Sequence, residues 1–233
     1  MNIQLLLVPY DTARPRWRCG AGPEHLVEAG LPLHLQGRGH RVSAIQVIED
    51  DASQSPAEIR TAFELMRRLA TAVQAARAAG RFPVILSGNC NAAVGALSGL
   101  TPTPRAIFWF DAHGESNTPD TTASGFLDGM GLSTALGWCW RSLAASVPGF
   151  EAVPPEATFL LGARDIDPME AALLSESKVT VLSVADVSAQ LPDRLAGARL
   201  PEGLGYLHLD LDVLDPESVG AANTHPVPGG LSV

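Results

Sequence analysis

The sequence alternates short runs that are apolar throughout with longer segments in which apolar residues recur at helical spacing. A strand without polar positions must be covered on both faces, as strands are in a parallel sheet flanked by helices. The repeated order of strand and helix along the chain favours the same architecture. We therefore predict an α/β fold of three layers, α/β/α, with a mainly parallel central sheet.

Strands are expected at the apolar runs, at residues 3–9, 41–48, 82–88, 105–113, 157–165, 178–184 and 204–214. The clearest helical pattern covers 55–80, where Ser55 suits the cap, Pro56 the first turn and Gly80 the end. Weaker helical patterns cover 22–36, 91–99, 129–139, 168–176 and 190–198. No repeat or linker divides the chain, so residues 1–233 are predicted to form a single domain.

Composition excludes several classes of protein. With 46% hydrophobic and 18% charged residues, the chain is too apolar to be disordered. A net charge of −9 with a single lysine, Lys178, leaves no cluster of cations for nucleic acid. No apolar run approaches the roughly 18 residues of a membrane span, and the first residues do not resemble a signal peptide. Cys19, Cys90 and Cys139 are odd in number and widely spaced, so no disulfide framework is expected. We predict a cytoplasmic protein that acts on a small molecule, without nucleic acid or membrane.

Potential metal ligands follow the expected strands at the end where ligands of such sheets bind. The run "AIFWF" leads directly into "DAHGES", and side chains two positions apart in an extended segment point the same way. The run "VILSG" leads into "NCN", and the strand "YLHLDLDVLDP" carries two aspartates. The six donor residues are Cys90, Asp111, His113, Glu115, Asp210 and Asp212.

Taken singly, each of these donors has a simpler explanation. A D-x-D pair is often a feature of a strand end, a lone histidine is often a hydrogen-bonded core residue, and a lone cysteine is often a small buried hydrophobe. Their coincidence favours metal, because carboxylates among apolar residues are costly without a positive partner and few cationic residues are nearby. Six donors are too many for one small cation but suit two bridged ones.

The segments "DAHGESNTPDTTASG", "LLGARDIDPME" and "HLDLDVLDPESVGAANTHPVPGGLS" resemble the arginase branch of the ureohydrolase family. The similarity runs from about residue 83 to the end. It implies a parallel sheet with helices on both faces and two manganese ions bridged by a hydroxide, which attacks a guanidinium carbon and releases urea. One ion would be held by Cys90, Asp111, Glu115 and Asp210, and the other by His113, Asp111, Asp210 and Asp212.

The resemblance also implies a small-molecule partner, a guanidino amino acid. The matching positions for its amino-acid end are Asn117, Thr122, Ser124, Asp167 and Glu170. These residue types can bind a carboxylate and an ammonium, but they equally suit turns and helix caps.

Several positions depart from the arginase pattern. Cys90 replaces a histidine, and its softer thiolate shifts the preference from manganese toward zinc, iron or cobalt. Glu115 replaces an aspartate, and Phe126 and Asp128 replace an asparagine and a proton-donating histidine. An aspartate near two cations should stay ionised, so Asp128 is a poor proton donor at neutral pH.

The cysteine ligand and the missing histidine are similar to a smaller branch that hydrolyses Nω-hydroxy-L-arginine to hydroxyurea and ornithine. Two further histidines lie near the expected site. His208 can orient a carboxylate, and His225, where the related motif has a small residue, can line the site or serve loop packing.

The chain ends directly after "PVPGGLSV", where the resemblance implies a further helix and strand. We therefore expect that a C-terminal part is missing. A sheet edge left uncovered invites pairing with another chain, so a homo-oligomer is possible.

Two functions follow from these observations. The first is a metal-dependent hydrolase with two metal ions that cleaves the guanidine group of arginine or Nω-hydroxy-arginine, giving urea or hydroxyurea plus ornithine, with Asp128 or a water handling the proton. The second is a catalytically impaired, metal-binding relative that acts as a partner or sensor.

Overall fold

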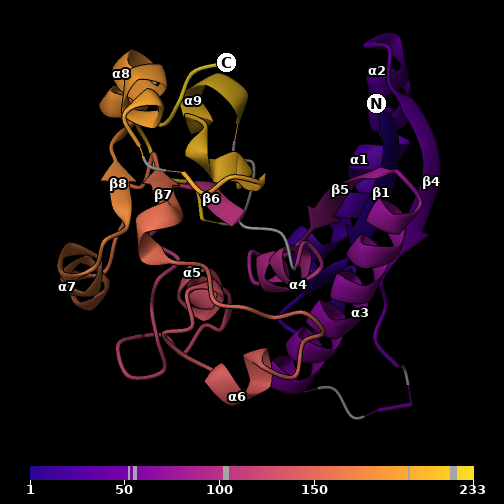
Figure 1. The fold of residues 1–233 in the computed structure, drawn as a ribbon, viewed down its shortest axis with the longest axis horizontal. Helices are drawn as coiled ribbons and strands as arrows, with labels where there is room; N and C mark the ends of the chain where they lie inside the picture. Colours follow the sequence, from indigo (N-terminus) through magenta and orange to yellow (C-terminus); the bar gives the residue numbers. More distant parts are fainter. Residues whose placement is uncertain (52, 55–56, 102–104, 199, 221–224) are drawn as a thin grey trace. The chain divides into compact units, whose positions relative to one another are not determined.

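The computed structural model describes residues 1–51, 53–54, 57–101, 105–198, 200–220 and 225–233. Two compact units make up the chain, the first comprising Met1–Thr101 and Arg141–Glu151 and the second Pro102–Trp140 and Ala152–Val233. Each unit contains a parallel sheet with helices, and the elements can be followed by label in Figure 1. The predicted α/β class is confirmed, with its parallel strands recorded in two sheets, and the single domain stays a prediction.

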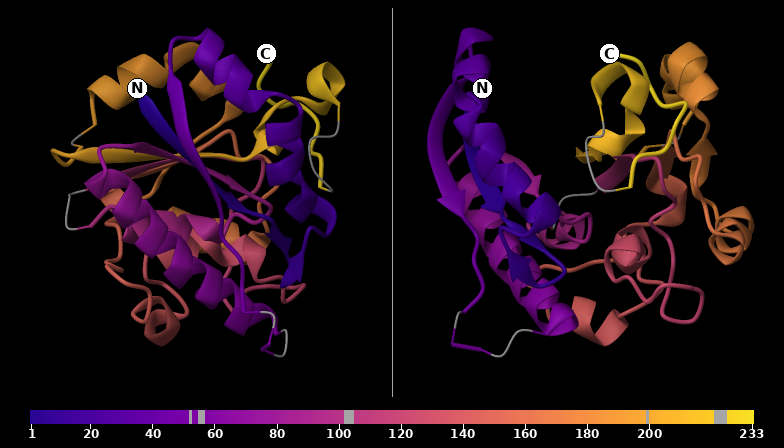
Figure 2. Two further views of the ribbon diagram at one scale, coloured as in Figure 1. Left: turned by 90° about the vertical axis from the view of Figure 1, so that its right-hand side faces the viewer. Right: turned by 180° about the vertical axis from the view of Figure 1, so that it is seen from behind.

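The first unit contains the strands β1 (Asn2–Val8), β4 (Arg41–Val47) and β5 (Phe82–Ser87), the hairpin β2 (Tyr10–Asp11) and β3 (Arg14–Pro15), and the helices η1 (Arg18–Ala21), α1 (Gly22–Glu28), α2 (Leu31–Gly37), α3 (Glu58–Ala78), α4 (Ala92–Ser98) and α6 (Arg141–Ala144). Its sheet has the order β4-β1-β5, with Leu5 paired to Ile45 on one side and to Val84 on the other. Since β1 is central and flanked by helices, its residues from Ile3 to Val8 are all buried (Figure 2).

The second unit contains the strands β6 (Arg105–Phe110), β7 (Thr158–Leu161), β8 (Thr180–Leu182) and β9 (Leu204–Leu209), and the helices η2 (Asp128–Met130), α5 (Gly131–Ala135), η3 (Pro155–Ala157), α7 (Pro168–Glu176), α8 (Val184–Ala196), η4 (Leu211–Val213) and α9 (Pro216–Val219). Its sheet has the order β8-β7-β6-β9, and all pairs are parallel. Phe159, Leu161 and Leu182 form a buried cluster with Val187 of α8. This core fixes the ends of the strands from which the candidate site extends.

The helix boundaries differ from the sequence expectation where local chemistry intervenes. The segment expected as one helix at 22–36 divides into α1 and α2 because Gly30 has a left-handed backbone, with φ of 97°. Helix α8 begins at Val184, six residues before the expected 190, because the Ser183 side chain accepts a hydrogen bond from the Asp186 N–H and forms a capping box. Helix α7 covers 168–176 as predicted. The predicted cap and first turn of the long helix, Ser55 and Pro56, lie outside the described residues.

Among the helices of the described ranges, none combines the length and the apolar character needed to span a bilayer.

Candidate metal centre and substrate site

The parallel pairing of β6 with β9 brings two aspartates from distant parts of the sequence to the same sheet edge. The strands end at Phe110 and Leu209, which are paired in register. The next residues are Asp111 and Asp210, and the Asp210 N–H still donates to the Phe110 carbonyl at 2.8 Å. The two aspartates therefore leave adjacent strand ends side by side.

Asp111, His113 and Asp212 form a compact group of potential metal ligands in the second unit. One ligand atom from each lies within 4.8 Å of the others. His113 Nδ1 is 3.4 Å from Asp111 Oδ1 and 3.1 Å from Asp212 Oδ2. Both aspartates are buried, with 0% and 3% of their surface exposed. The structure brings these three predicted residues together, and their role as metal ligands stays a prediction.

Backbone and side-chain donors hold these carboxylates in place. Asp111 accepts from the His113 N–H at 2.8 Å and from Trp109 Nε1 at 3.0 Å. Asp212 accepts from the Ala112 N–H at 3.0 Å, and its own N–H donates to Asp210 Oδ1 at 3.0 Å. The carboxylates are thus oriented by fixed donors, as supporting hydrogen bonds orient the ligands of metal sites.

Glu115 adds a further buried carboxylate. Its backbone has a φ of 52°, in the left-handed region, and its side chain is buried. Within the described part of the chain, its Oε2 is buried without a hydrogen-bond partner. Burial raises the pKa of Glu115 well above its ordinary value, and the negative charges of Asp111 and Asp128 raise it further. An oxygen in this situation suits a cation, since a buried unpaired polar atom is costly.

The pKa values of two neighbouring groups, Asp111 and His113, are raised as well. Burial raises the pKa of Asp111 to about 7, and the charges of Asp210 and Asp212 add to this. Hydrogen bonding to Asp111 and then to Asp212 raises the pKa of His113 to about 10. Crowded carboxylates that retain protons are the electrostatic condition that divalent cations relieve. The residues of this cluster therefore fit a metal site.

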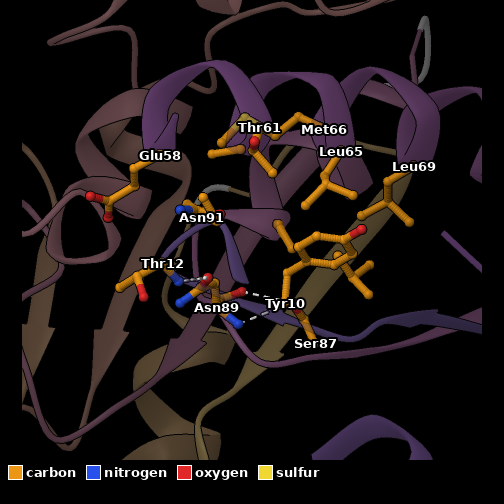
Figure 3. A pocket seen from close by; sticks show the side chains of 14 residues that line it. Tyr10, Thr12, Glu58, Thr61, Leu65, Met66, Leu69, Ser87, Asn89 and Asn91 are labelled. Carbon is orange, nitrogen blue, oxygen red and sulfur yellow. Dashed lines mark hydrogen bonds between the residues drawn. The ribbon is translucent and has the colours of Figure 1, made fainter. Parts of the chain in front are cut away.

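Cys90 lies in the first unit, buried at the start of α4. Its loop is held by Asn89, whose Oδ1 accepts from the Thr12 N–H at 3.3 Å (Figure 3). Tyr10, Thr61 and Asn91 are among the residues lining a neighbouring cavity of about 10 Å³, which has room for about one water molecule. This cavity is too small for an amino acid. The assignment of Cys90 as a ligand stays a prediction.

Three of the five predicted substrate residues are joined by hydrogen bonds. Asn117 Nδ2 donates to Asp167 Oδ2 at 3.0 Å. Glu170 accepts from the Ser116 N–H at 2.6 Å and from the Asp167 N–H at 3.2 Å, completing a capping box on α7. The Glu170 carboxylate is thus engaged with the backbone, as the alternative of helix capping predicts.

The other two predicted residues shape the loop after Asn117. Thr122 Oγ1 accepts from the Gly125 N–H at 3.0 Å, and Ser124 Oγ accepts from the Phe126 N–H at 3.2 Å. Each hydroxyl keeps a hydrogen that it can donate to a ligand. Binding and turn formation are therefore compatible at these positions.

A model described as the arginase family matches residues 1–233. The chain belongs to the arginase family. It is 28% identical to an arginase of Bacillus caldovelox over 99% of this chain and 82% of that protein, and 32% identical to Arginase-1 of Oryctolagus cuniculus over 99% and 77%. The crystal structure of an arginase from Bacillus cereus superimposes with a TM-score of 0.87 at 29% identity, covering 100% of this chain and 82% of that one. The chain is thus a metal-dependent hydrolase of the ureohydrolase type, as predicted.

Three of the positions that depart from the pattern described above, Phe126, Asp128 and His225, belong to the second unit, as the Asp111, His113 and Asp212 group does. Asp128 begins η2 and contributes to the raised pKa of Glu115. The ring of His225 stands edge-on to that of His113, with centroids 6.4 Å apart, and 6.2 Å from the ring of Phe126. Of the two roles considered for His225, a position lining the site is the one that this contact supports.

His208 lies beside the cluster, and its expected role of orienting a carboxylate stays a prediction. Its ring stacks on Trp109 with centroids 3.8 Å apart, and Trp109 in turn donates to Asp111. Burial lowers the pKa of His208 to about 3, so the ring is neutral. One of its ring nitrogens also lies within 4.8 Å of a carboxylate oxygen of Asp111.

Arg164 is, like Trp109, a residue of this site that sequence reasoning missed. Its guanidinium donates to five backbone carbonyls, at distances of 2.6–3.4 Å, those of Gly162, Asp212, Val213, Val227 and Pro228. It thereby ties the end of β7 to the turn that carries Asp212 and to the loop after His225. The signal was an arginine directly after an apolar strand, in "LLGARD".

Proposed function

We propose that this chain hydrolyses the guanidine group of an arginine-like amino acid, arginine or Nω-hydroxy-arginine, giving urea or hydroxyurea plus ornithine. The observation that supports this most directly is the Asp111, His113 and Asp212 group, extended by the partnerless Oε2 of Glu115 among the described residues. The names of the arginase relatives support the substrate class.

The donor set fits two divalent ions. One would be held by Cys90, Asp111, Glu115 and Asp210, and the other by His113, Asp111, Asp210 and Asp212, with Asp111 and Asp210 shared. When bound, two such ions lower the pKa of a water molecule and polarise the guanidine carbon. Carboxylate-rich ligands favour manganese, whereas the Cys90 thiolate would favour zinc, iron or cobalt.

The amino-acid end of the substrate would be bound by the loop after Glu115 and the turn before α7. Asn117, Thr122 and Ser124 offer donors to a carboxylate, and Asp167 offers an acceptor to an ammonium. Because Glu170 is buried and hydrogen-bonded to Ser116 and Asp167, its role is to hold this turn in position. Hydrolysis adds water to the guanidine carbon and breaks its bond to the side-chain nitrogen, which leaves as an amine after gaining a proton.

Asp128 is the residue proposed to handle that proton. Its negative charge contributes to the raised pKa of Glu115, which supports a role for Asp128 close to that carboxylate. An aspartate is a weaker acid catalyst at neutral pH than a histidine, because its proton is mostly lost. An N-hydroxyguanidine is less basic than a guanidine, so it can bind uncharged and needs less help in releasing its leaving group. Nω-hydroxy-arginine is therefore the favoured substrate.

Release of urea and hydroxyurea from arginine, Nω-hydroxy-arginine and agmatine by the manganese-loaded and zinc-loaded protein tests this proposal. We expect release from Nω-hydroxy-arginine faster than from arginine. Two bound metals without release from any of the three would favour the impaired, metal-binding relative. Equal or faster turnover of arginine would contradict the hydroxyarginine preference. Asp210→Ala should remove metal binding under either function, because it removes a shared ligand.

A further inference from the structure

We propose that Phe126 and His225 form an aromatic wall of the substrate site, and that this wall favours a guanidine with a substituent on its terminal nitrogen over an unsubstituted one. This inference rests on the proposed function, since it assigns residues that select among guanidines at that same site. It concerns the shape and the π faces of the rings, and no proton transfer by His225 is involved.

The three rings of His113, His225 and Phe126 follow one another at the edge of the cluster. The His113 and His225 rings meet edge to face at 87°, with centroids 6.4 Å apart. The His225 and Phe126 rings are tilted by 52°, with centroids 6.2 Å apart. His225 is exposed and Phe126 half-buried, whereas the carboxylates behind His113 are buried. The rings thus lead from His113, which contacts the buried carboxylates, to side chains that are exposed or half-buried.

Both rings are attached to anchored backbone. The residues after His225 are held by Arg164, whose guanidinium donates to the Val227 carbonyl at 2.6 Å and to the Pro228 carbonyl at 3.0 Å. Phe126 is followed by the buried Leu127, and its N–H donates to Ser124 Oγ. Aromatic side chains that are held in place but left out of the core are available to contact a ligand.

The chemistry of a guanidine makes such a wall selective. A guanidinium carries its N–H groups in one plane, and each needs an acceptor when it leaves water. The edge of the Phe126 ring offers hydrogen atoms and no acceptor in that plane. An unsubstituted terminal nitrogen would therefore lose hydrogen bonds against Phe126. A methyl group on that nitrogen replaces one N–H and packs against the ring. A hydroxyl group replaces the in-plane N–H by an O–H that can turn out of the guanidine plane, toward water or the π face of a ring.

The experiment compares kcat/KM for Nω-hydroxy-arginine and Nω-methyl-arginine with kcat/KM for arginine in the metal-loaded protein. In Phe126→Asn and His225→Ala, we expect this ratio to fall by about tenfold or more, within the range that one pocket contact contributes to discrimination. His225→Phe keeps a ring but cannot titrate, and should keep the ratio within about threefold. His25→Ala, an exposed histidine of α1, is the matched control and should leave the ratio unchanged.

An unchanged ratio in both Phe126→Asn and His225→Ala, with an active wild-type protein, would overturn the wall and leave the proposed function standing. If the wild-type protein binds metal but cleaves no guanidine, the proposed function fails instead. The wall is then tested by titration calorimetry with Nω-hydroxy-arginine and arginine. The same ratio of affinities for Nω-hydroxy-arginine and arginine in the wild type and in both variants would overturn the wall. A lower ratio in the variants than in the wild type would support it.

Discussion

At the scale of single residues, Arg164 joins three segments of the second unit, the end of β7, the turn that carries Asp212 and the loop after His225. All five N–H donors of a guanidinium are matched here by the five backbone carbonyls that it contacts. We expect Arg164→Met to weaken metal binding by about 10- to 100-fold, because the turn carrying Asp212 loses its support. Arg164→Lys keeps the charge and three donors, and should recover part of this loss. Competition with a fluorescent chelator measures the affinity, and wild-type affinity in Arg164→Met would contradict the role.

Gly114 is the second residue whose identity the site requires. A Cβ added there would lie 2.3 Å from Cδ of Glu170, which is itself bonded to Ser116 and Asp167. Gly114→Ala should therefore lower the free energy of unfolding by about 1–3 kcal/mol, as overpacking does elsewhere. Urea denaturation measures the change. Gly129→Ala, where a Cβ would meet no atom within 4 Å, is the control, and its free energy of unfolding should stay close to that of the wild type.

Sequence reasoning identified the donors Asp111, His113 and Asp212 because they interrupt or directly follow apolar strands, and such strand ends meet at one edge. It did not identify Arg164 or Trp109. Their contacts are made to backbone carbonyls and to a carboxylate already assigned, and contacts of this kind leave no pattern in spacing. Glu170 illustrates the opposite case, since its capping role and its family role were both open, and the hydrogen bonds show the former.

At the scale of elements, the link between the segment after β4 and the helix α3 depends on Asp50. Arg60 and Thr61, both on α3, donate to the Asp50 carboxylate. Burial alone would raise the pKa of Asp50, but the hydrogen bonds from Arg60 and from the Asp51 N–H outweigh it and lower the pKa below its ordinary value. The stability that Asp50 contributes is therefore present above about pH 4 and lost as the pH falls through the lowered pKa.

We expect Asp50→Asn to lower the free energy of unfolding by about 1–3 kcal/mol at pH 7, the range for a hydrogen bond to a charged group. The difference in the free energy of unfolding between the variant and the wild type should become smaller below about pH 4, where the Asp50 carboxylate begins to be protonated. Urea unfolding at several pH values measures it. Asp120→Asn, at an exposed loop carboxylate, serves as the control. A difference that persists unchanged at pH 3 would contradict the ion pair.

The strands were predicted more closely than the helix boundaries. Six of the seven expected strands contain the observed one, and the seventh, expected at 3–9, is shifted by one residue from β1 at Asn2–Val8, because an apolar run marks a covered strand directly. The short strands β2 and β3 were not expected. The expected runs at 105–113 and 204–214 continue past the last paired residues, Phe110 and Leu209, since the polypeptide stays extended as it enters the site. The starts and ends of helices depend on local events, such as the Ser183 cap and the Gly30 backbone, that periodicity does not report.

At the scale of the whole molecule, metal removal should make stability depend on pH. Without metal, the pKa of Asp111 is about 7 and that of His113 about 10, both above their ordinary values. A raised pKa means that the protonated group stabilises the fold, and this stabilisation is lost as the pH rises through the folded-state pKa. The melting temperature of the chelator-treated protein should therefore fall between pH 6 and pH 9, and less so with metal bound. A flat or rising profile without metal would contradict the cluster's electrostatics.

The pairing of distant segments was the part of the fold least accessible to sequence. Pairing between β6 and β9 joins Arg105 to Leu204, and its register decides that Asp111 meets Asp210. An order of strands in a sheet leaves no local pattern, so the α/β class could be predicted and the neighbours of each strand could not. The cytoplasmic location, the single domain and the homo-oligomer remain predictions. The chain spans 82% of the length of the Bacillus caldovelox arginase.

The central claim is that carboxylates from two adjacent strand ends hold a pair of divalent ions. Elemental analysis of the purified chain after loading with manganese and removal of free metal tests it directly. We expect two ions per wild-type chain and per Asp128→Asn chain, and fewer than one per Asp111→Asn chain with an unchanged circular dichroism spectrum. A wild-type chain without metal, or an Asp111→Asn chain that keeps two ions, would contradict the account.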